Sequence, residues 1–237
     1  MRTTHPAHSS LLKEIRARSG KGTSHSNNDS YLSSGHVYHN ISVPHRRFIA
    51  KQWLQKNTRL SSYEFLRVLD HLFKGKSHEE KTIACILLAY SEKHRKTVTV
   101  KRLDRWLNHL VGCAEIDSLC SNVFKAEEML ADWNRWRKFI AKLSKDKNIN
   151  KRRASLVFLT NAVRQSSDPR LKKLAFEIVD RLKSEKPILI TKAVSWVLRD
   201  LSYNHRRELI VYLTLNKDKL PKIALRETWR KIKTGRK

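Results

Sequence analysis

A tryptophan on a basic helix face is the feature of this sequence with the clearest chemical potential. In the segment 192–201, apolar residues recur at the i, i+3, i+4, i+7 spacing of a helix face that packs inward: Val194, Val197, Leu198 and Leu201. Trp196 falls nearly opposite this stripe, with Lys192 one turn before it and Arg199 three residues after it. An aromatic ring between two cations can stack on a nucleic-acid base and attract the phosphates. The alternative is that a second layer of the protein covers Trp196.

Three consecutive cations open another predicted helix, over residues 149–166. Lys151, Arg152 and Arg153 stand in its first turn, near the positive end of the helix dipole, where carboxylates would be more favourable. An anion that docks there would explain this choice of residues. Solvated surface charge in a generally basic chain is the alternative.

Asp117 is a candidate catalytic carboxylate. It lies on the flank of an inward-facing stripe on a helix predicted over 115–124, and this stripe consists of Ile116, Leu119, Cys120 and Val123. Cleavage of the N-glycosidic bond of a purine develops positive charge on the deoxyribose, and a fixed carboxylate can stabilise that charge and orient water. A purine alkylated at N3 or N7 is already cationic and leaves without a general acid, so one carboxylate suffices. Alternatively, Asp117 is the salt-bridge partner of a nearby cation.

The overall charge indicates a polyanionic partner. The chain has 50 Lys and Arg against 22 Asp and Glu, a net charge of +28 and a pI of about 10.4. Nucleic acid is the leading candidate, because each neutralised phosphate releases condensed counterions. An anionic membrane surface comes second. The longest apolar run, Ile83–Tyr90, is too short to span a bilayer.

Cysteine and histidine usage predicts no cofactor. The three cysteines form no CxxC pair, which argues for a reducing compartment such as the cytoplasm, or the nucleoid of a bacterium. His109 and Cys113 are four residues apart, but no second pair of ligands follows at zinc-like spacing. There is also no glycine-rich phosphate loop. We therefore expect no metal, nucleotide or redox cofactor.

The order of elements predicts an all-α fold. Residues 1–30 form a basic arm that is predicted to be flexible, although Leu11–Arg18 could make one short helix. From Pro44 onward glycine is rare, and prolines stand where helices should begin. Asp168, before Pro169, is a predicted N-cap. The predicted helices span 44–56, 61–74, 77–92, 99–110, 115–124, 126–144, 149–166, 169–184, 187–203, 205–215 and 220–233.

Short connections between these helices favour antiparallel pairs stacked side by side. No strict internal period is visible, which is compatible with the degenerate signal of HEAT-like repeats. The predicted architecture is a right-handed α-solenoid of HEAT-like helix pairs with a concave basic face, in a single domain over residues 31–237.

Six segments in this order resemble the DNA alkylation repair family, the AlkD-like HEAT-repeat glycosylases that act on N3- and N7-alkylated purines. The resemblance covers residues 31–233 and is densest at 43–53, 78–88, 115–119, 148–154, 190–199 and 220–228. It implies a monofunctional DNA glycosylase that leaves an abasic site in double-stranded DNA containing alkylated bases. A monomer without a cofactor is expected.

The resemblance also implies roles for individual residues. Asp117 falls on the catalytic carboxylate of the family, and Arg153 on an arginine that engages the DNA backbone near the lesion. Trp196 falls on an aromatic residue that cradles the damaged nucleotide, with Arg199 beside it as a phosphate contact. We expect further DNA contacts from Arg46, Arg47, Lys151, Arg152 and Lys192.

Two positions depart from the family pattern. Cys113 stands where a tryptophan precedes the carboxylate by four residues, and Asn150 stands where a tryptophan follows an Asn-Ile pair. The first change removes half of the aromatic cradle. It leaves room for a bulkier adduct or for a neighbouring ring from Trp106, Trp133 or Trp136. The alternatives are therefore a non-catalytic HEAT-repeat protein that binds damaged, distorted or branched DNA, and a helical adaptor for an acidic protein.

Overall fold

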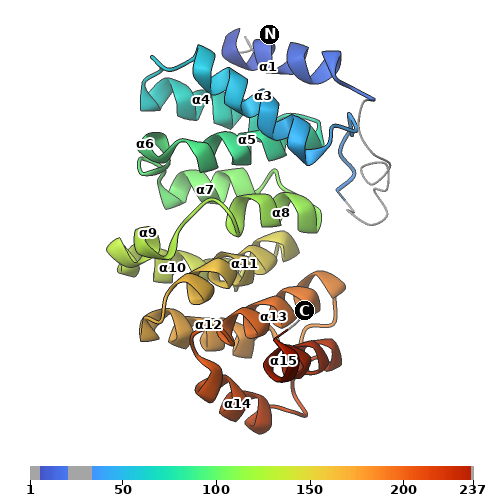
Figure 1. Ribbon diagram of the computed structural model, residues 1–237, viewed down its shortest axis with the longest axis vertical. Coiled ribbons are helices and arrows are strands. Elements are labelled where there is room, and N and C mark those ends of the chain that lie inside the picture. Colours follow the sequence, from blue (N-terminus) through green and yellow to red (C-terminus); the bar gives the residue numbers. More distant parts are fainter. Residues whose placement is uncertain (1–5, 21–33, 236–237) are drawn as a thin grey trace. The chain divides into compact units, whose positions relative to one another are not determined.

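The structure is a computed structural model that describes residues 6–20 and 34–235, and these residues form fourteen α-helices (Figure 1). Within those ranges there is no β-strand, only an isolated bridge between Val37 and Ser77. The predicted all-α class is confirmed. No helix of the described ranges combines the length and the apolar composition needed to cross a membrane. The helices are α1 (Pro6–Ala17), α3 (Val43–Lys56), α4 (Ser62–Phe73), α5 (His78–Tyr90), α6 (Glu92–Arg95), α7 (Val100–Leu107), α8 (Gly112–Cys120), α9 (Ala126–Ala131), α10 (Trp133–Leu143), α11 (Ile149–Gln165), α12 (Pro169–Leu182), α13 (Ile188–Leu201), α14 (Arg206–Leu215) and α15 (Lys222–Thr234).

The chain divides into two compact units, and each is described by itself. Unit 1 ends at Leu119 and holds α1 to α8, apart from the last residue of α8, while unit 2 begins at Cys120 and holds α9 to α15. Each unit buries its own set of aliphatic and aromatic side chains, and this burial is the main source of stability. The single domain predicted over 31–237 stays a prediction.

Serine caps define the central helices of unit 1. Ser61 begins α4 and Ser77 begins α5, each with a reciprocal capping box to the glutamate three residues later, Glu64 or Glu80. Such a cap stabilises a helix by about 1 kcal/mol. Helix α5 packs against α1, α3 and α4 and is buried along most of its length. It is therefore the centre of the unit and can carry buried polar residues.

Helix α1 corrects one prediction. Residues 6–17 form a helix with His8, Leu11 and Ile15 buried. The short helix suggested over Leu11–Arg18 is thus confirmed and begins earlier, at Pro6, whereas the predicted flexibility of the arm is wrong for this segment. Nε2 of His8 lies 3.1 Å from Oε1 of Glu80, and the His8 ring stacks on His71. These tertiary contacts order a segment whose composition alone suggested mobility. Residues 1–5 and 21–30 of the predicted arm lie outside the described residues.

Six helices of unit 2 form two rows, and the short helix α9 packs on α10 and α11. Helices α11, α13 and α15 pack against one another in sequence order, and we call them the first row. The second row contains α10, α12 and α14, each of which packs on first-row helices: α10 on α11, α12 on α11 and α13, and α14 on α13. Consecutive helices therefore form packed pairs, as the short connections predicted.

Most predicted helices occur within three residues of the predicted ends, and the exceptions have local causes. The helix predicted over 126–144 is broken at Asp132, whose φ of −128° and ψ of 53° are not helical. The helix predicted over 115–124 begins earlier, at Gly112, whose φ of 76° is open to glycine without strain. It ends at Cys120. The one-turn helix α6 was missed.

Candidate active site and nucleic-acid contacts

Asp117 lies on α8 and is half-buried. Cys113 stands one turn before it, is also half-buried, and therefore shares a face of the helix with it. The residues of the predicted inward stripe are all buried, but Val123 lies beyond the end of α8 and only the other three are on the helix. Helix α8 thus holds Asp117 at the border between the core of unit 1 and the solvent.

A buried carboxylate, Glu115, fixes helix α8. Its side chain is 1% exposed and accepts hydrogen bonds from the amide of Val111 at 3.0 Å, from Nδ1 of His36 at 2.9 Å and from Nδ1 of His78 at 3.1 Å. Burial alone would raise the pKa of Glu115, but these hydrogen bonds hold the pKa below its ordinary value. The charged carboxylate therefore ties α8 to α5 and to the segment before α3, two residues away from Asp117.

Arg46 belongs to the same network. Its Nη1 lies 3.2 Å from Nε2 of His78 and donates to Oγ1 of Thr82 at 2.6 Å. Because a guanidinium can only donate, Nε2 of His78 is an acceptor, and the proton of a neutral His78 lies on Nδ1, toward Glu115. Arg46, which was predicted to contact DNA, thus has internal bonds that the sequence did not reveal. Arg47 is exposed, and its contact with DNA stays a prediction.

The cations at the start of α11 have partners within the protein. Nζ of Lys151 lies 3.6 Å from the carboxylate of Asp146, and Lys151 is buried. Arg152 donates to the two oxygens of Glu185 at 2.8 and 3.0 Å and to the backbone carbonyls of Asp146 and Lys147. Carboxylates of this chain therefore balance two of these cations, and the predicted contacts of Lys151 and Arg152 with DNA stay predictions.

Arg153 links α11 to α13. It is 4% exposed, and its Nη1 donates at 2.5 Å to the carbonyl of Leu189, in the first turn of α13. Together with the Arg152–Glu185 pair, this bond fixes the connection into α13. Arg153 therefore helps to position the helix that carries Trp196, and its predicted contact with the DNA backbone stays a prediction.

Trp196 is only partly buried on α13. The predicted apolar stripe of Val194, Val197, Leu198 and Leu201 is confirmed, because all four residues are fully buried. Complete cover of Trp196 by a second layer is wrong. Lys192, one turn earlier on the same helix, is exposed. In unit 2 an aromatic side chain therefore reaches the solvent close to a cation.

Arg199 has a carboxylate partner that the sequence did not predict. Its Nη1 donates to Oε2 of Glu227 on α15, and to the hydroxyl of Ser195 at 2.7 Å. That hydroxyl in turn donates to Glu227 at 2.6 Å. Arg199 thus joins α13 to α15, and its predicted phosphate contact stays a prediction.

Two of the three tryptophans considered as replacements for the ring missing at Cys113 are buried in the core of their own unit. Trp106 is 2% exposed and its Nε1 donates to Asp70 at 2.6 Å, so it is a core residue of unit 1. Trp136 is buried in an aromatic cluster of unit 2. Trp133 is half-buried on α10.

Three carboxylates that organise these helices escaped the sequence analysis: Glu115, Glu185 and Glu227. One signal was available for Glu115, which stands one turn before the buried Leu119 and so shares its inward face. An acid in that position requires a buried donor. Within the described ranges, no three His, Cys, Asp or Glu side chains converge as a metal site would require.

A family comparison decides what kind of protein carries these helices. The sequence model of the family described as DNA alkylation repair enzyme matches residues 12–232. The chain belongs to this family. The resemblance inferred from the six segments is thus confirmed, and the match also includes the second half of α1. Membership indicates a role in DNA repair.

A solved structure gives the same fold. It is described as a predicted DNA alkylation repair enzyme from Enterococcus faecalis, with 14% sequence identity and a TM-score of 0.71, and the alignment covers 93% of this chain and 96% of that one. At this level of identity the likeness shows the fold alone. A search of curated proteins gave no match.

Proposed function

We propose that this member of the DNA alkylation repair family is a monofunctional DNA glycosylase. It hydrolyses the N-glycosidic bond of cationic N3- or N7-alkylated purines in duplex DNA. The observation that carries the proposal is the presentation of Asp117, a half-buried carboxylate on a helix that the buried Glu115 holds in place. A carboxylate fixed in advance stabilises developing positive charge without having to reorganise during the reaction.

The chemistry needs one acid group. As the bond breaks, its electron pair moves to the base and neutralises the charge of the alkylated ring, while the sugar becomes oxocarbenium-like. Asp117 stabilises that sugar and orients the water that attacks it, and the products are the free base and an abasic site. We also propose that the enzyme works as a monomer, without a cofactor, in the cytoplasm, where its three free thiols stay reduced.

Trp196 is the proposed aromatic contact to the damaged nucleotide. A ring next to a cationic base contributes about 0.5–2 kcal/mol of cation–π attraction, and Trp196 is partly accessible on α13. The exposed Lys192 and Arg47 are the proposed phosphate contacts. We assign Arg153 and Arg199 primarily to positioning, because both are bonded within unit 2.

A base-excision assay tests the proposal. The full chain is incubated with duplex DNA that contains 7-methylguanine, and the free base is quantified by mass spectrometry beside a count of abasic sites. Wild type should release base above a control without protein, and Asp117→Asn should lower the rate by about 100-fold or more. The matched control is Glu127→Gln, which neutralises an exposed carboxylate on α9 and should leave the rate unchanged. Equal rates for wild type and Asp117→Asn would remove the role of Asp117.

A second candidate function is favoured by Cys113. The family pattern has a tryptophan at this position, and the rings of Trp106 and Trp136 are buried. Under this alternative the protein binds damaged, distorted or branched DNA without cleaving it. No base would then be released by any variant. Affinity would still fall steeply with salt, with a slope of about one per phosphate contact, and Trp196→Ala would weaken binding.

A further inference from the structure

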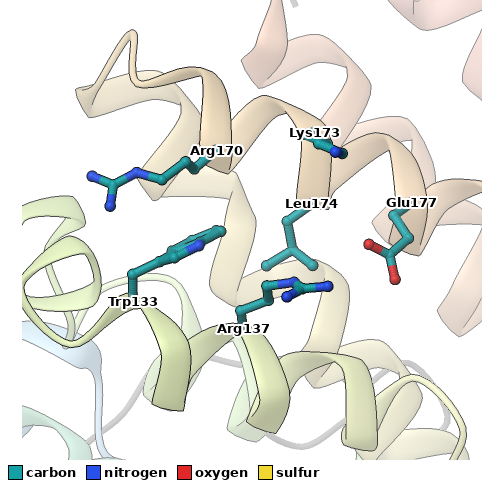
Figure 2. A pocket seen from close by; sticks show the side chains of 6 residues that line it. All are labelled: Trp133, Arg137, Arg170, Lys173, Leu174 and Glu177. Atoms are coloured by element: carbon teal, nitrogen blue, oxygen red, sulfur yellow. The ribbon is translucent and has the colours of Figure 1, made fainter.

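Unit 2 contains a pocket that is lined by none of Asp117, Arg153, Trp196 and Arg199. It has a volume of about 250 Å³ and lies between α10 and α12. Figure 2 shows Trp133 and Arg137 on one helix, facing Arg170, Lys173, Leu174 and Glu177 on the other. Both helices belong to the second row, whereas Arg153 and Trp196 belong to the first. The pocket is therefore built independently of the proposed glycosylase residues.

One wall of the pocket is suited to a flat aromatic ligand. The guanidinium carbon of Arg170 lies 5.6 Å from the centre of the Trp133 ring, and the two side chains are neighbours in Figure 2. Asp168 holds this guanidinium from outside the pocket, with Nη2 to Oδ2 at 2.8 Å and Nε to Oδ1 at 3.0 Å. Nucleic-acid bases stack on indole rings and on guanidinium planes of this kind. The buried Leu174 closes the pocket with apolar surface.

The remaining wall carries unbalanced positive charge. Arg137 and Lys173 are exposed, and within the described residues neither side chain has a hydrogen bond or an ion pair. By contrast, Arg152 and Arg199 in the same unit are balanced by carboxylates. The acid of the pocket, Glu177, lies 3.4 Å from Arg181, outside the pocket. Two cations are thus available to an anionic group that enters.

We infer that this pocket binds a nucleoside 5′-phosphate, as a free nucleotide or as an unpaired nucleotide of a DNA strand. The base stacks on Trp133 beside Arg170, and the phosphate lies against Arg137 and Lys173. Glu177 can accept a hydrogen bond from an amino group of the base. The volume lies just below the range of about 300–1,000 Å³ of sites that enclose drug-sized ligands, so a single nucleotide would be only partly enclosed.

Isothermal titration calorimetry on the full chain tests this inference with four probes. These are deoxyadenosine 5′-monophosphate, inorganic phosphate, a duplex with one unpaired adenosine, and the same duplex fully paired. The monophosphate should bind, and Trp133→Ala should weaken it by about tenfold or more, as expected for the loss of one stacked base. Trp133→Phe keeps a stacking ring and should retain most of the affinity.

The charge contribution is tested with matched pairs of substitutions. Arg137→Ala with Lys173→Ala should weaken the monophosphate by about tenfold or more. Arg135→Ala with Lys138→Ala removes two exposed cations of α10 that do not line the pocket and should change little. If the duplex with the unpaired adenosine displaces the monophosphate and the paired duplex does not, the ligand comes from a strand. If neither duplex displaces it, the ligand is a free nucleotide.

Three results would overturn the inference. The first is binding of neither the monophosphate nor the duplex with the unpaired adenosine. The second is inorganic phosphate that binds as tightly as the monophosphate, with no effect of Trp133→Ala. The third is an equal loss in both pairs of charge variants, which would mean a general charge effect. Base release from 7-methylguanine DNA should persist in the variant with Arg137→Ala and Lys173→Ala, whose residues have no role in the proposed glycosylase, so the pocket and the glycosylase can fail separately.

Discussion

The two units fix their candidate functional helices with networks of opposite polarity. In unit 1 a buried acid, Glu115, receives three hydrogen bonds and holds α8. In unit 2 buried or half-buried guanidinium groups donate instead, Arg153 to a carbonyl of α13 and Arg199 to a carboxylate of α15. A carboxylate titrates at moderately acid pH, whereas a guanidinium stays charged. The comparison teaches that the chain, although strongly basic, holds α8 through a buried acid in unit 1 and α13 through cations in unit 2.

Removal of the acid should therefore have the largest effect. Glu115→Ala leaves His36 and His78 without their acceptor and should lower the free energy of unfolding by about 3 kcal/mol, as for the breaking of a buried polar pair. Urea unfolding followed by circular dichroism measures it. Glu92→Gln, at an exposed carboxylate paired with Lys96, is the control and should stay within about 0.5 kcal/mol. If Glu115→Ala lowered the free energy of unfolding by less than about 1 kcal/mol, the hydrogen bonds of Glu115 would not be a main source of the stability of unit 1.

Removal of one guanidinium in unit 2 should lower the free energy of unfolding by less, because Arg152 and Arg199 also hold α13 or the connection into it. Arg153→Ala should cost about 2 kcal/mol through the lost bond to Leu189 and the space left in the packing. Hydrogen exchange should become faster in the first turn of α13 and stay unchanged in α8. Arg153→Lys keeps a donor and should lose less. If α8 and α13 responded equally, the supports of the two helices would not be separate.

Much of this fold follows from local pattern. The stripe around Trp196 predicted both the helix and its buried face, because four apolar residues at helical spacing have one way to be buried together. Asp168 was correctly predicted as an N-cap, and its side chain accepts from the amide of Arg170. In contrast, only Leu11–Arg18 was suggested as a helix, within an arm predicted to be flexible, because the order of α1 comes from tertiary contacts such as His8 with Glu80.

The candidate site was less predictable than the fold. The positions of Asp117 and Trp196 on their helices follow from sequence spacing and are confirmed. The partners of the cations do not follow from sequence spacing. Arg152 binds Glu185, thirty-three residues away, and Arg199 binds Glu227, twenty-eight residues away. No helical or strand period links such pairs. A cation that binds an internal carboxylate and one that binds a phosphate look the same in a sequence.

Acid should destabilise unit 1 at a higher pH than unit 2. The pKa of Glu115 and that of Glu80 lie below the ordinary 4.5 despite burial, so the folded state binds fewer protons than the unfolded state below that pH. Their stabilisation is complete above about pH 4.5 and is lost as the pH falls further. In unit 2 the carboxyl groups with lowered pKa, Asp168 and Glu208, are at the surface, where solvent screens them.

Hydrogen exchange between about pH 5 and about pH 3.5, corrected for the intrinsic rate, measures this difference. Protection should fall first in α5 and α8 and later in α11 and α13. This pH range lies below the ordinary histidine pKa of 6.5. Histidines with a lowered pKa are present in both units, for example His109 in unit 1 and His205 in unit 2, so their protonation destabilises both units and not unit 1 alone. If protection were lost at the same pH in both units, protonation of Glu115 and Glu80 would not determine the acid stability of unit 1.

The smallest effect on stability is expected from Glu227, the carboxylate that pairs with Arg199 in unit 2. Glu227→Gln keeps the size of the side chain and an acceptor for Ser195 and Arg199, so the free energy of unfolding should change by less than about 1 kcal/mol. The charge of Arg199 is no longer balanced, however. The slope of log affinity for duplex DNA against log salt should then steepen by about one, as for one additional phosphate contact. Arg199→Ala should leave the slope as in wild type, because Glu227 already neutralises that cation. If instead Arg199→Ala flattened the slope by about one, Arg199 would be a phosphate contact in the native protein, and unit 2 would bind DNA through the cations that hold it together.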